Sequence, residues 1–298
     1  MGKLSEEGTK AGNLQRACLA ILREHQADGA LPTSGRFIFY ELLSRGVIPK
    51  MYYYPDGRQK PRTPSQDVAE ASYHLREIGE VDWDWIVDET RGLTSWRYAE
   101  SVYRYVEDGL SHARIDLWGG EPPPLILCES RSLAGVLKRI AGTYLCPIAA
   151  TNGQVGGFVH TDLGPLVEGA HGDVQRVFYL GDLDFSGGQI EANTRKVLSR
   201  YGNLQWERIA ITEEQAHSHS LTPIPKPDKR FRPVRHYDAI ETEALKQTEI
   251  QRILTERLNR ELTEPLDEVL SREREQRVHV RDLLNSPKDG IEPPPTNR

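Results

Sequence analysis

The chain lacks long apolar stretches and has few cysteines, and each absence excludes a class of protein. No run approaches the roughly 20 apolar residues that a membrane-spanning helix needs, so we expect no contact with the membrane interior. The first 16 residues also lack the apolar core of a secretory signal. Three cysteines among 298 residues, at spacings that fit no zinc ribbon, are typical of reduced thiols. We therefore expect a cytoplasmic protein.

The sequence also lacks an excess of positive charge and a phosphate-binding loop. Lys and Arg number 38 against 44 Asp and Glu, which gives a formal charge of −6. This acidity does not favour a nucleic-acid partner, but local basic segments decide such binding. Because no glycine-rich P-loop is present, any use of ATP would require another protein.

The apolar pattern divides the chain into three parts. Residues 1–115 hold three amphipathic segments and then the alternating VDWDWIVD, which predicts an α-rich winged helix-turn-helix domain, although any small helical domain fits equally well. Beyond GGEPPP, residues 120–245 alternate short apolar runs with helical segments. This alternation predicts an α/β domain with a parallel sheet and helices on both faces. Residues 246–298 are charged and helical, and we expect a disordered tail.

Carboxylates follow two of the predicted strands. Glu129 comes directly after LILC, and Asp182 and Asp184 come after VFYL and one glycine. The carboxyl ends of parallel strands form one rim where ligands bind, so these acids should converge. A helix cap is the simpler explanation of an aspartate there, but Gly187 and Gly188 would also let backbone approach a ligand closely. Clustered carboxylates suit Mg²⁺, and such a site can bind a phosphodiester.

These features resemble a known family. A glutamate at one strand end and an Asp-x-Asp after a later strand look like the Toprim domain, which topoisomerases, primases and several nucleases share. The segment ETEAL at 241–245, and the stretch ITEEQ with the Pro-Lys and Asp-Lys-Arg runs before it, are similar to the DNA-cleaving component of topoisomerase VI and its relatives. TSGRFIFY at 33–40 resembles the segment of that family that carries a DNA-attacking tyrosine, with one aromatic residue replacing the first of two tyrosines.

The resemblance implies an enzyme that uses Mg²⁺ or Mn²⁺ to cleave double-stranded DNA. Asp182 and Asp184 would bind the metal. Glu129 would bind metal or act as an acid or base. Glu243, or otherwise Glu241, would complete the acidic rim.

The resemblance also implies a nucleophile and partners. Tyr40 would attack DNA and form a phosphotyrosyl bond. If Tyr40 is instead a core residue, water would be the nucleophile, as in the Toprim nuclease of the Wadjet plasmid-defence system. The family further implies a homodimer, a separate ATPase protein if ATP is used, and association with the nucleoid.

Basic residues flank the predicted acidic rim. The segment IPKPDKRFRPVRH at 224–236 carries five cationic side chains and one acidic one, and its position favours contact with DNA phosphates over a merely solvated loop. Arg131 follows Glu129 and is a further candidate. The third predicted helix is acidic, which argues against DNA reading by that helix. The DNA-binding candidates are therefore Arg131, Lys226, Lys229, Arg230 and Arg232.

Two functions of other classes remain open. The chain would be a DNA-binding regulator if its Toprim-like domain were inert, and such a protein would keep its function when Asp184 is changed. It would be a phosphotransferase if Asp182 were a nucleophile, an interpretation that leaves Glu129 and Glu243 unexplained.

Overall fold

The computed structural model describes residues 3–87, 96–152, 157–170, 174–228 and 235–285. Its contacts group residues 1–90 with 122–257 in one unit, and residues 91–121 with 258–298 in a second. The sequence-based boundaries at 115 and 245 divide the chain differently, because they follow composition along the chain and not contacts across it. In the described part of the chain, no helix is both long and apolar enough to span a membrane.

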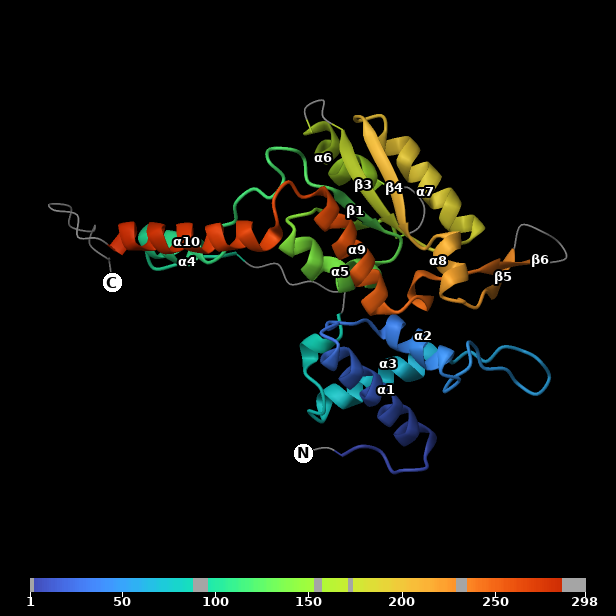
Figure 1. The fold of residues 1–298 in the computed structure, drawn as a ribbon. Helices are drawn as coiled ribbons and strands as arrows, with labels where there is room; N and C mark the ends of the chain where they lie inside the picture. Colours follow the sequence, from blue (N-terminus) through green and yellow to red (C-terminus); the bar gives the residue numbers. More distant parts are fainter. Residues whose placement is uncertain (1–2, 88–95, 153–156, 171–173, 229–234, 286–298) are drawn as a thin grey trace. The chain divides into compact units, whose positions relative to one another are not determined.

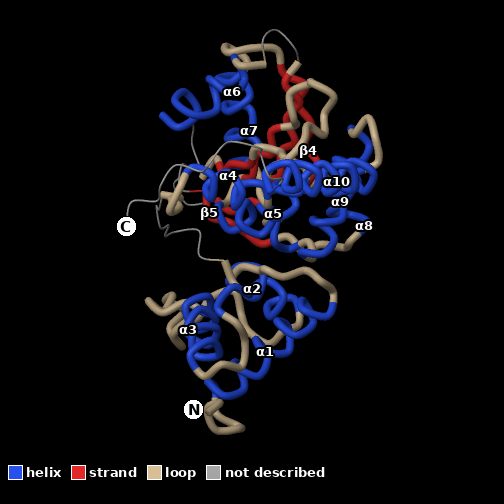
Figure 2. The backbone as a smooth tube through the Cα atoms, turned by 90° about the vertical axis from the view of Figure 1, so that its left-hand side faces the viewer, coloured by secondary structure: helices blue, strands red, loops and turns tan. Residues whose placement is uncertain are grey.

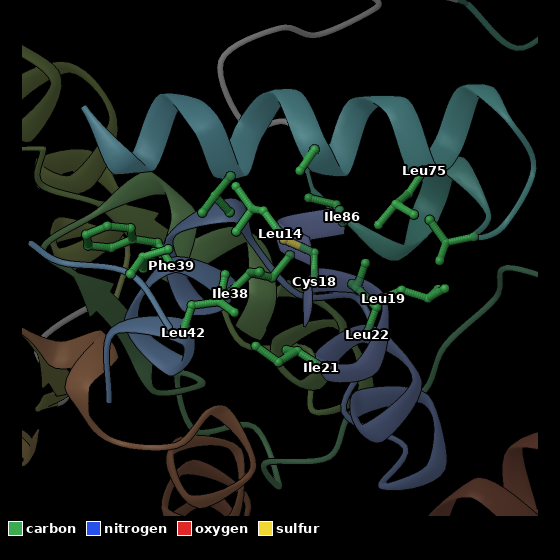
Figure 3. Packing of buried hydrophobic residues seen from close by; sticks show 14 of the residues in the cluster. Leu14, Cys18, Leu19, Ile21, Leu22, Ile38, Phe39, Leu42, Leu75 and Ile86 are labelled. Atoms are coloured by element: carbon green, nitrogen blue, oxygen red, sulfur yellow. The ribbon is translucent and has the colours of Figure 1, made fainter. Parts of the chain in front are cut away.

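Three helices form the N-terminal part of the first unit: α1 (Lys10–Ala27), α2 (Gly35–Ser44) and α3 (Pro64–Glu77). Each begins at a hydroxyl residue whose side chain accepts a backbone N–H of the first turn, and Thr63 forms a full capping box with Gln66. Their apolar faces meet in one buried cluster (Figure 3), which includes Leu14, Cys18, Leu22, Ile38, Phe39, Leu42 and Leu75.

The segment after α3 differs from the sequence prediction. The described part of VDWDWIVD, residues 81–87, is not a strand: Trp83–Trp85 form the 3-10 helix η1, and Ile86 makes an isolated bridge to Thr33. The alternation failed as a signal because, among the described residues, Thr33 alone pairs with this stretch. Residues 45–63 join α2 to α3, whereas a helix-turn-helix uses a turn of three or four residues. The helical character is confirmed, and the winged arrangement stays a prediction.

A parallel sheet forms the second part of this unit. It contains β1 (Leu125–Cys128), β2 (Ile148–Ala150), β3 (Gln175–Leu180) and β4 (Leu204–Ala210) in the order β2-β1-β3-β4. The predicted parallel sheet is confirmed. In its register Cys128 pairs with both Ala150 and Leu180, so the residues that follow these three strands meet at one edge.

Helices cover both faces of the sheet (Figures 1 and 2). On one face Leu127, Val177 and Tyr179 pack against the π-helical turn η2 (Val159–Leu163), α6 (Gly164–Glu168) and α7 (Phe185–Leu198). On the other side lie α5 (Arg131–Thr143) and α9 (Gln247–Glu261), whose Arg257 guanidinium is 4.7 Å from the ring centre of Phe178. This double cover explains why the strands are continuous apolar runs in the sequence.

After β4, the chain forms α8 (Glu213–Ser218) and then an antiparallel pair, β5 (Ile224–Asp228) and β6 (Arg235–Ala239). From the sequence we expect prolines to hold this basic stretch extended, and its described residues are extended and paired. Beyond β6, Ile240 pairs with Leu183 through two backbone hydrogen bonds of 2.8 and 3.1 Å. That pairing places the 3-10 helix η3 (Thr242–Ala244) beside the end of β3.

The second unit contains α4 (Val102–Leu110) and α10 (Leu266–Asn285). The hydroxyl of Tyr103 donates to the carbonyl of Leu284 at 3.2 Å. Glu273 is buried in α10 and accepts from Arg114 at 2.9 Å and from the backbone N–H of Ile115 at 3.0 Å. Among the described residues, α10 is thus held to residues 114–115 by a partly buried ion pair and a backbone hydrogen bond.

Candidate active site

The ends of β1 and β3 bring the first two acids into contact. The Glu129 N–H donates to the carbonyl of Leu180 at 2.8 Å, which continues the strand pairing by one step. Glu129 Oε2 then accepts the backbone N–H of Asp182 at 2.9 Å. The acids expected to converge at this edge therefore do lie together there.

Two glycines make room for this contact. A Cβ at Gly181 would lie 2.9 Å from Glu129 Oε2, and a Cβ at Gly187 would lie 2.5 Å from the carbonyl oxygen of Asp182. Both distances are too short for a side chain, so glycine is required at these two positions. Gly188 has open space around it and has no such role.

Asp184 is both a helix cap and a member of the cluster. Its Oδ1 accepts the N–H of Gly187 at 2.7 Å, which caps α7. Its Oδ2 accepts from Lys226 Nζ at 2.8 Å. Burial alone would raise the pKa of Asp184, but the hydrogen bonds from Lys226 and Gly187 outweigh it and hold that pKa below its ordinary value. Asp184 therefore is a helix cap, and its role as a metal ligand stays a prediction.

Lys226 lies among the carboxylates. Its ammonium is 2.8 Å from Asp184, 3.4 Å from Asp182 and 3.6 Å from Glu241. The sequence favoured a phosphate-binding loop for Lys226, whereas here β5 directs its side chain to the acids. The other candidates of that loop, Lys229, Arg230 and Arg232, lie outside the described residues.

The segment after β6 supplies two more carboxylates. Glu241 pairs with Arg36 at 2.9 Å and with Lys50 at 3.3 Å. Glu243 is 2% exposed and pairs through Oε1 with Arg36 at 3.1 Å, while its Oε2 has no hydrogen-bond partner among the described residues. Burial raises the pKa of Glu243, and the nearby Arg36 only partly opposes this.

Hydroxyl groups fix the position of these acids. The hydroxyls of Ser130 and Ser132 donate to Glu243 Oε1 at 3.1 and 3.3 Å. Thr242 donates both its N–H and its hydroxyl to Asp182 Oδ1, at 2.9 and 3.0 Å. The serines that follow Glu129 thus orient Glu243, and the threonine that precedes Glu243 orients Asp182.

Charge is not balanced within this cluster. Five carboxylates face three cations, so the cluster has an excess of two negative charges when every group is ionised, and the raised pKa values of Glu129 and Glu243 reduce that excess near neutral pH. As they stand, no three His, Cys, Asp or Glu side chains within the described ranges are arranged to hold a metal ion. The Oδ2 atoms of Asp182 and Asp184 nevertheless converge on the single ammonium of Lys226. The carboxylates are Glu129, Asp182, Asp184, Glu241 and Glu243, and the cations are Arg36, Lys50 and Lys226.

A hollow of about 160 Å³ opens onto these groups. It is lined by Arg36, Glu129, Ser130, Asn152, Asp182 and Thr242. Burial, and then the charge of Asp182, raise the pKa of Glu129 to about 7. Glu129 is therefore suited to exchange a proton near neutral pH at the wall of this opening.

This raised pKa predicts a pH dependence of stability. A carboxyl whose folded pKa is about 7 against an ordinary 4.5 favours the folded state when protonated. The stability that this protonated carboxyl contributes is complete below its ordinary pKa of 4.5 and is lost as the pH rises through 7. We expect wild type to lose stability relative to Glu129→Gln over this window, measured by urea unfolding in EDTA. Stability curves that stay parallel for the two proteins would contradict the raised pKa.

Tyr40 lies near the cluster but in the apolar core. Its side chain is 5% exposed and its ring packs edge-on against Phe39. The sequence predicted Tyr40 at the edge of the buried stripe with a wet polar tip; instead Lys50 donates to its hydroxyl, with Nζ 4.5 Å from the ring centre. Burial, and then the charges of Arg36 and Lys226, lower the pKa of Lys50 to about 8. Lys50 thereby links Tyr40 to Glu241.

Sequence reasoning named Lys226 but missed the other two cations of this site, Arg36 and Lys50. Arg36 lies in the segment that resembles the topoisomerase family. Its ion-pair partners, Glu241 and Glu243, are about 200 residues further along the chain, so no local pattern predicts these pairs. Lys50 carries no motif at all. The pattern Ser-x-Ser directly after Glu129 was a usable signal, because hydroxyls next to a strand-end acid often orient carboxylates.

Comparisons with known proteins do not assign this site to a family. No family model, no curated protein and no solved structure matches the chain. The Toprim resemblance therefore stays a prediction, and the function rests on the site alone. Chemically, the site offers oxygen ligands, a proton-exchanging carboxyl and cations beside an opening.

Proposed function

We propose that the chain is a Mg²⁺-dependent enzyme that cleaves DNA phosphodiesters at this carboxylate cluster. The convergence of Asp182 and Asp184 on the Lys226 ammonium carries the proposal. Oxygens that surround a monovalent cation in this way also suit a hard divalent one. Mg²⁺ usually binds through one or two carboxylates and completes its shell with water and substrate phosphates, so two converging aspartates suffice. Mn²⁺ would accept the same ligands.

A bound metal ion, Arg36 and Glu129 would each contribute to such a reaction. A bound divalent ion would offset the negative charge that develops on the phosphate. Arg36 is 38% exposed and is held by two glutamates, so its guanidinium can bind a phosphate oxygen in the opening. Glu129 would give a proton to the leaving oxygen or take one from an attacking group.

Two nucleophiles are compatible with this site. Tyr40 would form a phosphotyrosyl intermediate: the contact of its hydroxyl with Lys50 favours that role, whereas the burial of its ring in the core favours water. Otherwise water attacks, and the protein is a Toprim-type nuclease. With Tyr40 as nucleophile, the proposal extends to a homodimer on double-stranded DNA like the DNA-cleaving component of topoisomerase VI, with ATP use assigned to a separate protein.

The experiment that tests the proposal uses the full chain and a supercoiled plasmid. We expect breaks in the presence of Mg²⁺ or Mn²⁺ and none in EDTA, and a gel that separates nicked, linear and relaxed DNA distinguishes the type of break. An intact plasmid with both metals at stoichiometric protein would refute the proposal.

Removal of Lys226 should strengthen metal binding. Its ammonium competes with a divalent ion for Asp182 and Asp184, so Lys226→Met should raise Mg²⁺ affinity by about tenfold or more. Isothermal titration calorimetry measures this, with Lys196→Met on the exposed side of α7 as the matched control. An affinity for Mg²⁺ that is unchanged or lower in Lys226→Met would show that the two aspartates do not hold the ion.

One observation favours a second function, that of a DNA-binding regulator with an inert acid cluster. Lys226, Arg36 and Lys50 already pair with the carboxylates, as they would in a structural ion network. A regulator would bind DNA equally well with and without Mg²⁺ and would leave every plasmid intact. The plasmid assay therefore separates the two functions.

A further inference from the structure

A second, larger hollow adjoins the carboxylate site. Its volume is about 510 Å³, within the range of pockets that hold small ligands. Asn152 lines both this hollow and the smaller one that reaches Glu129 and Asp182, so the two adjoin. The larger hollow is lined by Arg131, Ala134, Lys138, Ile148, Ala149, Ala150, Thr151, Asn152, Phe158 and Val159.

One wall of this hollow is apolar and aromatic. It combines the residues of β2, at the edge of the sheet, with Phe158. The Phe158 side chain is 42% exposed although it lies beside the buried Val159. An exposed aromatic ring in a concave site offers a flat face on which another ring can stack.

The opposite wall is cationic. Arg131 and Lys138 lie seven positions apart on α5, about 10 Å along the helix axis, and both are exposed. Neither forms an ion pair with another residue that the structure describes, in contrast to Arg36 and Lys226. Two exposed cations without an ion-pair partner among the described residues suit the phosphates of a nucleic-acid strand.

The junction between the two hollows is a constrained turn. Asn152 has φ of 52°, in the left-handed region, and its N–H donates to the carbonyl of Glu129 at 3.0 Å. The backbone of Asn152 is therefore fixed beside the strand-end acid. A strand that has one phosphate at the carboxylates would pass Asn152 as it enters the larger hollow.

We propose that this hollow binds one unpaired nucleotide of the DNA strand that is cut, with the base stacked on Phe158 and the phosphates at Arg131 and Lys138. The inference rests on the proposed function for the identity of the strand. Only an unpaired base can bring a ring face against Phe158 inside a hollow of this size. The site therefore selects DNA that is single-stranded or locally opened next to the cut.

The experiment measures binding without cleavage, in EDTA, by fluorescence polarisation of a short labelled oligodeoxythymidine. Phe158→Ala should weaken binding roughly 5- to 100-fold, as loss of one stacked base does, and Phe158→Tyr should restore it. The double variant Arg131→Gln, Lys138→Gln should reduce the salt dependence of log Kd by about 1.4, the value for two phosphates of a single strand. Arg139→Gln, an exposed neighbour outside the hollow, is the matched control and should leave both unchanged.

An oligonucleotide with one abasic position tests the stacking directly. Wild type should bind it more weakly than the intact strand, and Phe158→Ala should bind the two alike. Equal binding by Phe158→Ala and Phe158→Tyr, or a double variant that behaves like Arg139→Gln, would overturn the inference. Free thymidine monophosphate competing as well as the oligonucleotide would also overturn it, because the site would then take a free nucleotide. If the plasmid stays uncut while these binding effects are observed, the proposed cleavage is refuted and the proposed nucleotide site is not.

Discussion

Asp184→Asn should abolish DNA cleavage and leave the fold almost unchanged. Asparagine can still accept the N–H of Gly187, so the cap of α7 is kept. The substitution removes the negative charge that faces Lys226, and with it one of two ligands expected for Mg²⁺. We expect the single-turnover rate to fall at least about 10³-fold, which is about 4 kcal/mol in barrier height. Quantified nicking of supercoiled plasmid in Mg²⁺ measures it.

A matched substitution controls for the loss of one acid. Asp238→Asn makes the same change at an exposed position of β6, outside the cluster, and should cut at the wild-type rate. Thermal unfolding in EDTA should give similar midpoints for the two variants. Near wild-type cleavage by Asp184→Asn would place the reaction elsewhere on the molecule.

If Tyr40 is the nucleophile, Tyr40→Phe should bind DNA and Mg²⁺ normally but form no covalent adduct and make no break. The ring is in the apolar core, so phenylalanine preserves its packing and only the hydroxyl that contacts Lys50 is lost. That loss costs about 1.5–3 kcal/mol of stability, because the bond has a charged partner. Cleavage that needs a phosphotyrosyl bond would instead disappear entirely. Denaturation with detergent followed by gel analysis reveals DNA bound covalently to protein.

Tyr52→Phe is the matched control for this change. The Tyr52 hydroxyl also bonds to a charged group, Asp67 at 2.8 Å, but lies away from the carboxylate cluster. It should lose similar stability and keep its cleavage and its adduct. If Tyr40→Phe cuts at the wild-type rate and wild type traps no DNA, water is the nucleophile and the protein is a hydrolytic nuclease.

The sequence predicted the sheet and its acids because both depend on local pattern. Short apolar runs bounded by glycine and helical segments identify buried parallel strands, and an acid directly after such a run must lie at the sheet edge. Glu129, Asp182 and Asp184 followed from this rule alone. The sequence predicted that Gly187 and Gly188 let backbone approach a ligand, whereas in the structure Gly187 is needed because a Cβ would clash with the Asp182 carbonyl oxygen, and Gly188 has open space.

The remaining features depend on contacts between distant segments. Lys226 reaches the aspartates because the pairing of Ile240 with Leu183 brings the end of the β5–β6 hairpin to β3, and no local pattern predicts that pairing. The alternation in VDWDWIVD predicted a strand, but a strand also requires a partner along its length. Tyr40 was expected near solvent, whereas Lys50, ten positions later, folds over its hydroxyl.

The measurement that most directly tests the central claim locates the metal. Fe²⁺ replaces Mg²⁺ at sites with oxygen ligands, and with ascorbate and peroxide it cuts the polypeptide next to its position. We predict cuts beside Glu129, beside residues 181–184 and beside residues 241–243, all suppressed by excess Mg²⁺ and absent in Asp184→Asn. Cuts that appear elsewhere, or that Asp184→Asn leaves unchanged, would contradict a divalent-ion site between Asp182 and Asp184.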